Sequence, residues 1–215
     1  MRRLFPELGE PPGRLGVVSW RPARGGFEAV DVACCGFGLA AAGAGAAALL
    51  ATRSDSACLV GLAGTFDGAL LPPGSAVVAD RVGIAGLGLP REPRSMGGIA
   101  SELSGDPSLQ PPPDPWLPPG MDRLARMGGM LSVAIPSVDR DEAALRATAN
   151  RGCLAEEMEA HAVLHAAGLL GRRLVVVRGI SNVAGDRDTS AWRLDEAFAA
   201  IRTVLDKWLD GEDNR

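Results

Sequence analysis

Short apolar runs alternate with helical patterns along most of this chain, and this alternation restricts the possible folds more than any other feature. Four apolar runs predict strands, at 57–62, 76–82, 130–135 and 174–177. Patterns with a repeat near 3.6 residues predict helices at 39–52, 139–150 and 157–170, with a last helix from about Trp192. Such a rhythm is typical of an α/β domain with a mostly parallel sheet.

Two segments lie outside this rhythm. Residues 15–20 and 28–34 are β-type runs on either side of a turn rich in proline and glycine, which predicts a hairpin. Proline is so frequent at 107–120 that it excludes regular structure there. We therefore expect a surface loop at 107–120, with a lid over a pocket as the alternative.

The size and charge of the chain limit what it can do. Its 215 residues, 47% of them hydrophobic, predict a single domain over residues 1–215. A net charge of −4 argues against a nucleic-acid partner, which would require a clustered basic face. The longest apolar stretch, 39–51, is too short to span a bilayer, so we expect no membrane partner either.

The cysteines and the first residues predict a cytoplasmic protein. Cys34, Cys35, Cys58 and Cys153 have no metal-ligand spacing, and two of them are adjacent, which suits a reduced protein better than a disulfide scaffold. The chain opens without the apolar core of a signal peptide.

Two local patterns offer chemistry that we weigh against simpler explanations. Gly36 and Gly38 lie between a predicted strand and a predicted helix, as in a dinucleotide-binding turn, but no acidic residue ends the next strand. The simpler explanation is a tight turn close to a ligand. His161 and His165 are four residues apart, with Glu157 one turn earlier, so they could share one helix face and bind a metal. Their small apolar neighbours favour buried histidines instead, and we expect no metal.

A third pattern is the most informative. We place Glu157, Met158 and Glu159 in an apolar helix, where a buried carboxylate is costly unless it accepts hydrogen bonds. A carboxylate suits the two hydroxyls of a ribose, although an exposed charged helix face is the alternative. After the next strand come Ser181 and Asn182, at the edge of the sheet where α/β folds bind ligands. This combination predicts a site for a purine nucleoside.

At these residues the chain resembles the nucleoside phosphorylase and nucleosidase superfamily, and within it the futalosine hydrolase family. The most specific agreement is 178–188 with Trp192, together with 157–159 and the small-residue helix after it. Weaker agreement at 35–38, 61–64 and 74–80 extends the resemblance over nearly all of the chain beyond Phe27. It implies a three-layer α/β fold, with a central mixed sheet flanked by helices.

The resemblance also implies roles for single residues. Glu159 would bind the ribose hydroxyls, Met158 would pack on the sugar, and Ala63 and Gly64 would line the pocket at the glycosidic bond. Asn182 would act on the leaving base, in place of the aspartate of methylthioadenosine and adenosylhomocysteine nucleosidases. An asparagine amide both donates and accepts, which suits a 6-oxopurine such as the hypoxanthine of futalosine.

Around this core of the site, three further residues receive roles. Arg178 and Ser181 would bind substrate, and Asp188 would be catalytic as a partner of the base or of Arg178. For Asp188 the alternative is the capping of a helix N-terminus. Phosphorylases of the superfamily bind phosphate with an arginine where this chain has Leu59, so water is the expected nucleophile.

The implied function is therefore hydrolysis of futalosine to hypoxanthine and dehypoxanthine futalosine, in menaquinone biosynthesis. We expect a small nucleoside substrate, no cofactor and a homo-oligomer. The alternatives are another purine nucleosidase, of the methylthioadenosine or adenosylhomocysteine type, and an inactive nucleoside-binding protein.

One part of the family pattern is missing. Family members begin with an apolar strand and a glutamate that activates water, whereas residues 2–8 resemble the end of the helix that follows. We expect that strand to be absent from this sequence and the true start to lie upstream of Met1. If Met1 is the start, Glu7 or Glu10 would have to act as the base, or the protein would not turn over.

Overall fold

The computed structural model describes residues 4, 17–20, 30–52, 56–85 and 113–210. The strands are β1 (Val17–Trp20), β2 (Val30–Ala33), β3 (Ser56–Thr65), β4 (Ala76–Ala85), β5 (Arg126–Val133), β6 (Cys153–Glu157) and β7 (Arg173–Val183). The helices are α1 (Gly38–Leu50), α3 (Met121–Leu124), α4 (Arg140–Ala149), α5 (Ala160–Leu169) and α6 (Leu194–Asp210), with a 3₁₀ turn, η2, at Thr189–Ala191.

Five strands form one mixed sheet that curves until its edges meet, in the order β3-β6-β5-β4-β7. The pairs β3–β7, β4–β5 and β5–β6 are parallel, whereas β4–β7 and the short β3–β6 contact are antiparallel. The long parallel pairing of β3 with β7 brings the pocket residues predicted on two distant segments side by side.

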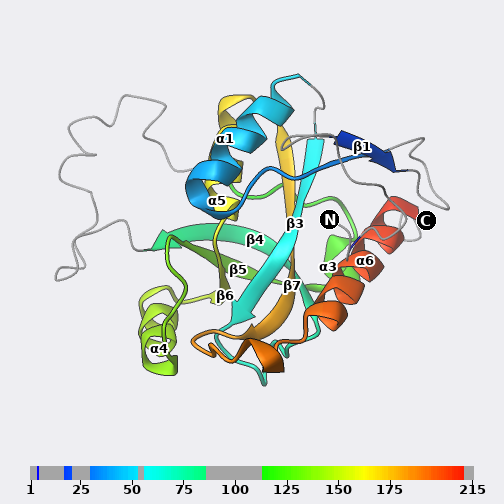
Figure 1. Cartoon of the computed structure of the whole chain (residues 1–215). Helices are drawn as coiled ribbons and strands as arrows, with labels where there is room; N and C mark the ends of the chain where they lie inside the picture. The colour runs from blue at the N-terminus through cyan, green and yellow to red at the C-terminus, as the bar shows by residue number, and fades with distance from the viewer. Residues whose placement is uncertain (1–3, 5–16, 21–29, 53–55, 86–112, 211–215) are drawn as a thin grey trace, which may run out of the picture.

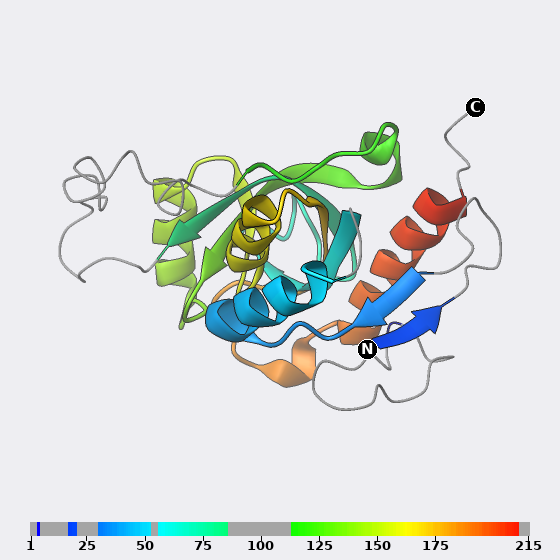
Figure 2. The ribbon, with the colours of Figure 1, turned by 90° about the horizontal axis from the view of Figure 1, so that it is seen from above.

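Helices cover this sheet on different sides, as Figures 1 and 2 show. Helices α1 and α5 lie against each other, and Ala162 lies so close that a Cβ added at Gly43 would be 3.2 Å from its side chain. The small residues of α5 therefore allow the close approach of α1. Helix α6 packs on the other side, where Ile201, Val204 and Leu205 are buried. The expected central mixed sheet with flanking helices is confirmed.

The predicted N-terminal hairpin is confirmed as a strand pair. Strands β1 and β2 are antiparallel over four residue pairs, from Val17 opposite Ala33 to Trp20 opposite Val30. The turn between them lies outside the described residues, and so do residues 1–3 and 5–16, which include Glu7 and Glu10. The expectation of a missing first strand concerns that part of the chain.

The strand predicted at 130–135 is β5, which begins earlier, at Arg126, and two further differences in bounds affect the site residues. Residues 157–159 are not part of a helix, because Glu157 ends strand β6, and α5 begins only at Ala160. Strand β7 does not end at Val177 but continues to Val183, so that Arg178, Ser181 and Asn182 lie within it. In both cases pairing with neighbouring strands overrides the local preference of the sequence.

The proline-rich segment packs on the protein over its described end, residues 113–120. Trp116 donates its backbone N–H to Leu174 O at 2.8 Å, and the Arg173 guanidinium carbon lies 4.5 Å from the centroid of the Trp116 ring. Trp116 and Leu117 also pack against the core under α6. This end is therefore not the exposed loop that we expected, although residues 107–112 are not described.

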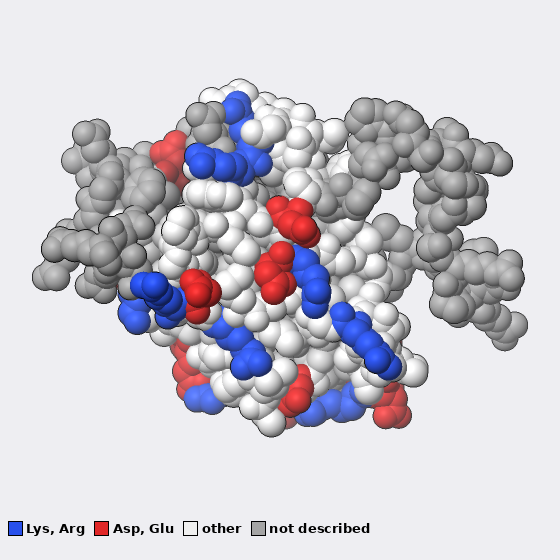
Figure 3. Space-filling view, turned by 180° about the vertical axis from the view of Figure 1, so that it is seen from behind, with Lys and Arg blue, Asp and Glu red and all other residues white. Residues whose placement is uncertain are grey.

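The surface agrees with the charge balance of the sequence. On the face shown in Figure 3, basic and acidic side chains alternate, and the described residues form no continuous basic stripe there. None of the described helices is long and apolar enough to cross a membrane.

Candidate active site

Arg178 is the buried centre of the candidate site. It lies on β7 opposite Gly61 of β3, and only 1% of its side chain is exposed. A Cβ at Gly61 would collide with Nη1 of Arg178, so the glycine makes room for the guanidinium. The absence of a side chain at Gly61 of β3 therefore leaves the space that the Arg178 side chain of β7 occupies.

Glu157 neutralises this cation. Its Oε2 accepts a hydrogen bond from Arg178 Nη2, and from the backbone N–H groups of Glu159 and Ala160 at 2.9 and 2.8 Å. Its Oε1 accepts from the Ser132 hydroxyl. Burial raises the pKa of the Glu157 carboxyl, but Arg178 and these hydrogen bonds outweigh burial, so the pKa lies below its usual 4.5. Glu157 is therefore ionised at neutral pH.

Glu159 lies in the turn before α5 and is held from two sides. Its Oε1 accepts the backbone N–H of Gly38 at 2.9 Å, at the start of α1, and its Oε2 lies 3.4 Å from Arg178 Nη2. The anion at this helix N-terminus is thus a carboxylate of the protein itself. Gly36 and Gly38 have φ values of 125° and 76°, which a tight turn of this kind requires.

The amide of Asn182 has a defined orientation. Its Oδ1 accepts from the Ser181 hydroxyl at 2.7 Å, and its Nδ2 donates to Val183 O at 2.9 Å. The Nδ2 group lies 3.5 Å from Asp186 O, which also accepts from Trp192 Nε1 at 3.2 Å. Of the two N–H groups of Nδ2, the one directed at Asp186 O makes the longer and weaker contact, so it is the donor that a ligand can take over.

A cavity of about 1510 Å³ connects these groups. Its lining includes all but one of the predicted site residues: Ala63, Gly64, Met158, Glu159, Arg178, Ser181 and Asn182. The predicted carboxylate and carboxamide thus line one cavity, with Glu159 in the turn before α5 and Asn182 within β7.

Asp188 is the predicted residue that does not line this cavity. It is exposed, and its Oδ1 accepts from the backbone N–H and the hydroxyl of Ser190 at 3.0 and 2.6 Å. These two bonds lower the pKa of Asp188. Asp188 thereby caps the turn η2, which is the alternative that the sequence left open.

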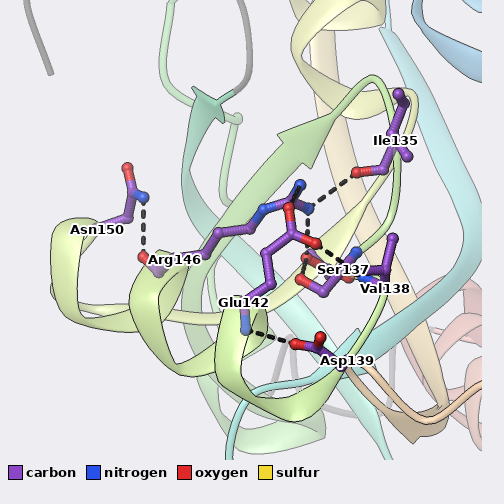
Figure 4. Close-up of polar contacts among 8 residues, drawn as sticks. Ile135, Ser137, Val138, Asp139, Glu142, Arg146 and Asn150 are labelled. Carbon is purple, nitrogen blue, oxygen red and sulfur yellow. Dashed lines mark hydrogen bonds and ion pairs between the residues drawn. The ribbon is translucent and has the colours of Figure 1, made fainter. Parts of the chain in front are cut away.

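The sequence analysis missed two residues that line the cavity, Glu156 and Ser137, and Arg146, which bonds Glu156. Glu156, 5% exposed, accepts from the backbone N–H and the hydroxyl of Ser137, both at 2.7 Å, and from Arg146 Nη1 at 3.0 Å. Figure 4 shows Arg146 extending from α4 toward Ile135 and Ser137 of the loop between β5 and α4. Glu156 directly precedes Glu157, and in a strand two successive side chains point to opposite faces. Recognising this segment as a strand would therefore have separated Glu156 from Glu157 and indicated a second carboxylate site.

Glu157, His161 and His165 do not lie on one helix, as the metal site considered in the sequence analysis would require. Glu157 ends β6, so it does not share a helix face with His161 and His165, and its carboxylate bonds Arg178 and Ser132. Among the residues that the structure describes, no three His, Cys, Asp or Glu side chains form a group that could hold a metal ion.

Replacing Gly61 with alanine should disrupt the site from β3. The new methyl group would displace the Arg178 guanidinium from Glu157, and overpacking of this kind costs about 1–3 kcal/mol. We expect a lower midpoint of denaturant unfolding and loss of nucleoside binding. Gly83→Ala on β4 is the matched control, because its nearest neighbour would be at an ordinary 3.5 Å. Equal stability and binding of the two variants would contradict this geometry.

With this geometry established, comparisons with known proteins place the chain among relatives of one kind. The family model of the phosphorylase superfamily matches residues 17–210. The chain is 31% identical over 212 residues to the futalosine hydrolase of Streptomyces coelicolor, covering 95% of this chain and 87% of the relative. It is 32% identical over 213 residues to the futalosine hydrolase of Thermus thermophilus, covering 95% and 89%.

Among solved structures, the fold is similar to that of a methylthioadenosine/adenosylhomocysteine nucleosidase from Colwellia psychrerythraea in complex with adenine. The TM-score is 0.65 at 22% identity, covering 91% of this chain and 87% of the other. At this identity the likeness concerns the fold alone.

Proposed function

Because this chain belongs to the phosphorylase superfamily, we propose that it hydrolyses the N-glycosidic bond of futalosine, releasing hypoxanthine and dehypoxanthine futalosine on the way to menaquinone. The observation that supports the proposal is the shared cavity, whose lining includes Glu159, Arg178 and Asn182. Both relatives described above are futalosine hydrolases, and the similarity covers 87% and 89% of their length.

Glu159 is the group that binds the ribose hydroxyls in this proposal. Two donors already occupy part of its acceptor capacity, and the rest is available because a carboxylate has about four acceptor positions. Met158, which also lines the cavity, packs on the sugar, and Ala63 with Gly64 leaves room for the glycosidic bond. Arg178 and Ser181, the other two residues predicted to bind substrate, also line the cavity, and their hydrogen bonds position Glu159 and Asn182.

The net charge of the site favours cleavage of the N-glycosidic bond with a positive charge developing on the sugar. Arg178 contributes one positive charge and Glu157 and Glu159 two negative charges, so the cluster is net negative by one. A sugar that loses its base develops oxocarbenium character, and a fixed negative charge nearby stabilises it in the transition state. The same charge repels a phosphate dianion.

Water is therefore the proposed nucleophile. Leu59, where phosphorylases carry an arginine, is a buried residue of β3 that lines the same cavity. An apolar side chain cannot bind phosphate, whereas water needs no such partner. Asp188 is assigned to ordering the loop before η2, because it caps that turn.

Asn182 is the proposed group that acts on the leaving base. The N–H that lies 3.5 Å from Asp186 O can donate to a purine acceptor instead, and replacement of Asn182 by aspartate removes that donor except in the protonated acid. We expect Asn182→Asp to lower kcat/KM for futalosine by about 10- to 100-fold at pH 7, as for a lost hydrogen bond of about 1.5–3 kcal/mol. The loss should shrink as the pH falls toward 4, because the acid regains a donor. A pH profile without such recovery would contradict this role.

A direct assay tests the whole proposal. The purified protein is incubated with futalosine, inosine and methylthioadenosine, with and without phosphate, and free base is measured by chromatography. We expect hypoxanthine from futalosine without any need for phosphate. Adenine from methylthioadenosine with nothing from futalosine would overturn the substrate, and strict phosphate dependence would overturn the reaction type.

Two alternative functions, another purine nucleosidase and a nucleoside-binding protein without turnover, are distinguished by further results. Release of adenine from methylthioadenosine would identify the second candidate, a nucleosidase of the methylthioadenosine type. Binding of futalosine by calorimetry without release of base would instead identify a nucleoside-binding protein without turnover.

We propose further that residues 1–215 form one domain, and that the protein is a cytoplasmic homo-oligomer. All four cysteines are free thiols, in keeping with a reducing compartment. Ile135 and Val138, 67% and 61% exposed, flank the loop at the cavity wall, and a second copy could cover them. Light scattering after size-exclusion chromatography measures the assembly directly, and a monomer at micromolar concentration would contradict the oligomer.

A further inference from the structure

Three adjacent strands place a carboxylate, a glycine and a carboxamide in one row. Gly64 of β3 lies opposite Glu156 of β6 on one side and opposite Asn182 of β7 on the other. Residues directly opposite each other in a sheet share one face. In agreement, a Cβ added at Gly64 would lie 3.4 Å from Asn182 Nδ2. Two polar side chains thus flank a position that has no side chain.

This row has the dimensions of a nucleobase held at two edges. Neighbouring strands are about 4.8 Å apart, so Glu156 and Asn182 are separated by about 10 Å across Gly64. Glu156, Gly64 and Asn182 all line the cavity. A flat bicyclic base with one hydrogen bond at each edge spans a similar distance.

Glu156 retains one acceptor position in this arrangement. From the part of the chain that the structure describes, its Oε1 accepts the Ser137 N–H alone, whereas its Oε2 accepts from the Ser137 hydroxyl and from Arg146. A carboxylate has about four acceptor positions, so three are occupied and one remains on Oε1. Arg146 Nη1, which bonds Glu156, also donates to Ile135 O at 2.9 Å, and this second bond holds the nitrogen in place; Glu142 pairs with the other nitrogen, Nη2 (Figure 4).

We propose that Glu156 is a specificity-determining residue, which accepts a hydrogen bond from N1–H of a 6-oxopurine. This inference rests on the proposed function and adds a second contact to the base. Hypoxanthine carries a proton on N1, whereas adenine has a lone pair there, and a lone pair facing a carboxylate oxygen is repelled. Glu156 therefore selects for the oxo base and against the amino base. Arg146 and Ser137 are its positioning residues.

Binding of free bases tests the inference independently of turnover. Isothermal titration calorimetry gives the Kd of hypoxanthine and of adenine, and the wild type should favour hypoxanthine. In Glu156→Gln the amide can donate to adenine N1, so we expect the ratio of the two Kd values to fall by about 10- to 100-fold. Glu156→Asp, which withdraws the carboxylate by one methylene, should lower the ratio in the same direction and serves if the first variant is unstable.

Glu142→Gln is the matched control. Glu142 bonds the same arginine, Arg146 Nη2, at 2.6 Å, but it is not among the residues that line the cavity. A structural effect transmitted through Arg146 would weaken both bases equally and leave the ratio unchanged. An unchanged ratio in both Glu156 variants, with hypoxanthine still bound by the wild type, would overturn the inference alone. Failure of the wild type to bind either base would overturn the proposed function as well.

Discussion

Arg178→Met should lower the free energy of unfolding by about 3–5 kcal/mol and abolish detectable hydrolysis. The substitution leaves Glu157 buried without its cation, and an uncompensated buried charge is among the costliest defects in a protein. It also releases Glu159, which Arg178 holds from one side. Denaturant unfolding monitored by circular dichroism measures the stability, and base release measures the activity.

Two controls separate the lost ion pair from a general effect of the substitution. Arg193→Met removes an exposed arginine that pairs with Glu196, and surface pairs contribute only about 0–1 kcal/mol. The double variant Glu157→Gln/Arg178→Met removes both buried charges and should recover most of the lost stability. If the double variant were as unstable as Arg178→Met, the stability would not depend on the pairing of these charges.

The same pair predicts how stability responds to pH. Glu157 has a folded-state pKa below its usual 4.5, so its contribution is present above that pH and is lost as the pH falls through the folded-state value. The wild type should therefore lose stability on acidification below about pH 4.5, and Arg178→Met should lose this dependence.

Glu159→Gln should lower kcat/KM for futalosine by about 10²- to 10³-fold with little loss of stability. The amide has nearly the shape of the carboxylate, but it removes the negative charge that stabilises the developing sugar cation. The side chain is partly exposed, so the fold does not depend on its charge in the way that it depends on Glu157. Steady-state rates of hypoxanthine release measure the effect.

A substrate without the 2′-hydroxyl tests the assigned contact. If Glu159 binds that hydroxyl, the wild type should react more slowly with the 2′-deoxy analogue, and Glu159→Gln should discriminate less between the two substrates. Glu196→Gln, an exposed carboxylate on α6, is the control with wild-type rates. Equal discrimination in the wild type and in Glu159→Gln would assign the ribose to another group.

The alternation of apolar runs and helical patterns was enough to predict an α/β domain, because buried strands and amphipathic helices differ in their period, whereas the mixed sheet was predicted only from the family resemblance. Strand β6 was not predicted, because most of its residues from Leu154 to Glu157 are good helix formers. Its pairing with β5 and β3 decides its conformation, and such long-range pairing has no local signature. The arginine and glycine at 178–179 hid the length of β7 in the same way.

The site was predictable in part for a similar reason. Glu159 and Asn182 belong to a segment pattern specific enough to suggest a nucleoside, and both line one cavity. Glu156 was missed because its partners come from α4 and the loop before it, and only the folded chain brings them together. Gly36 and Gly38 suggested an external anion, whereas the amide at the start of α1 binds Glu159.

The most direct measurement is a crystal structure of the protein with a non-hydrolysable nucleoside analogue of hypoxanthine. We predict that one bound molecule places its ribose hydroxyls against Glu159 and its purine against Asn182, within the cavity that contains Arg178. An analogue bound elsewhere, or one whose sugar and base contact neither side chain, would contradict the account.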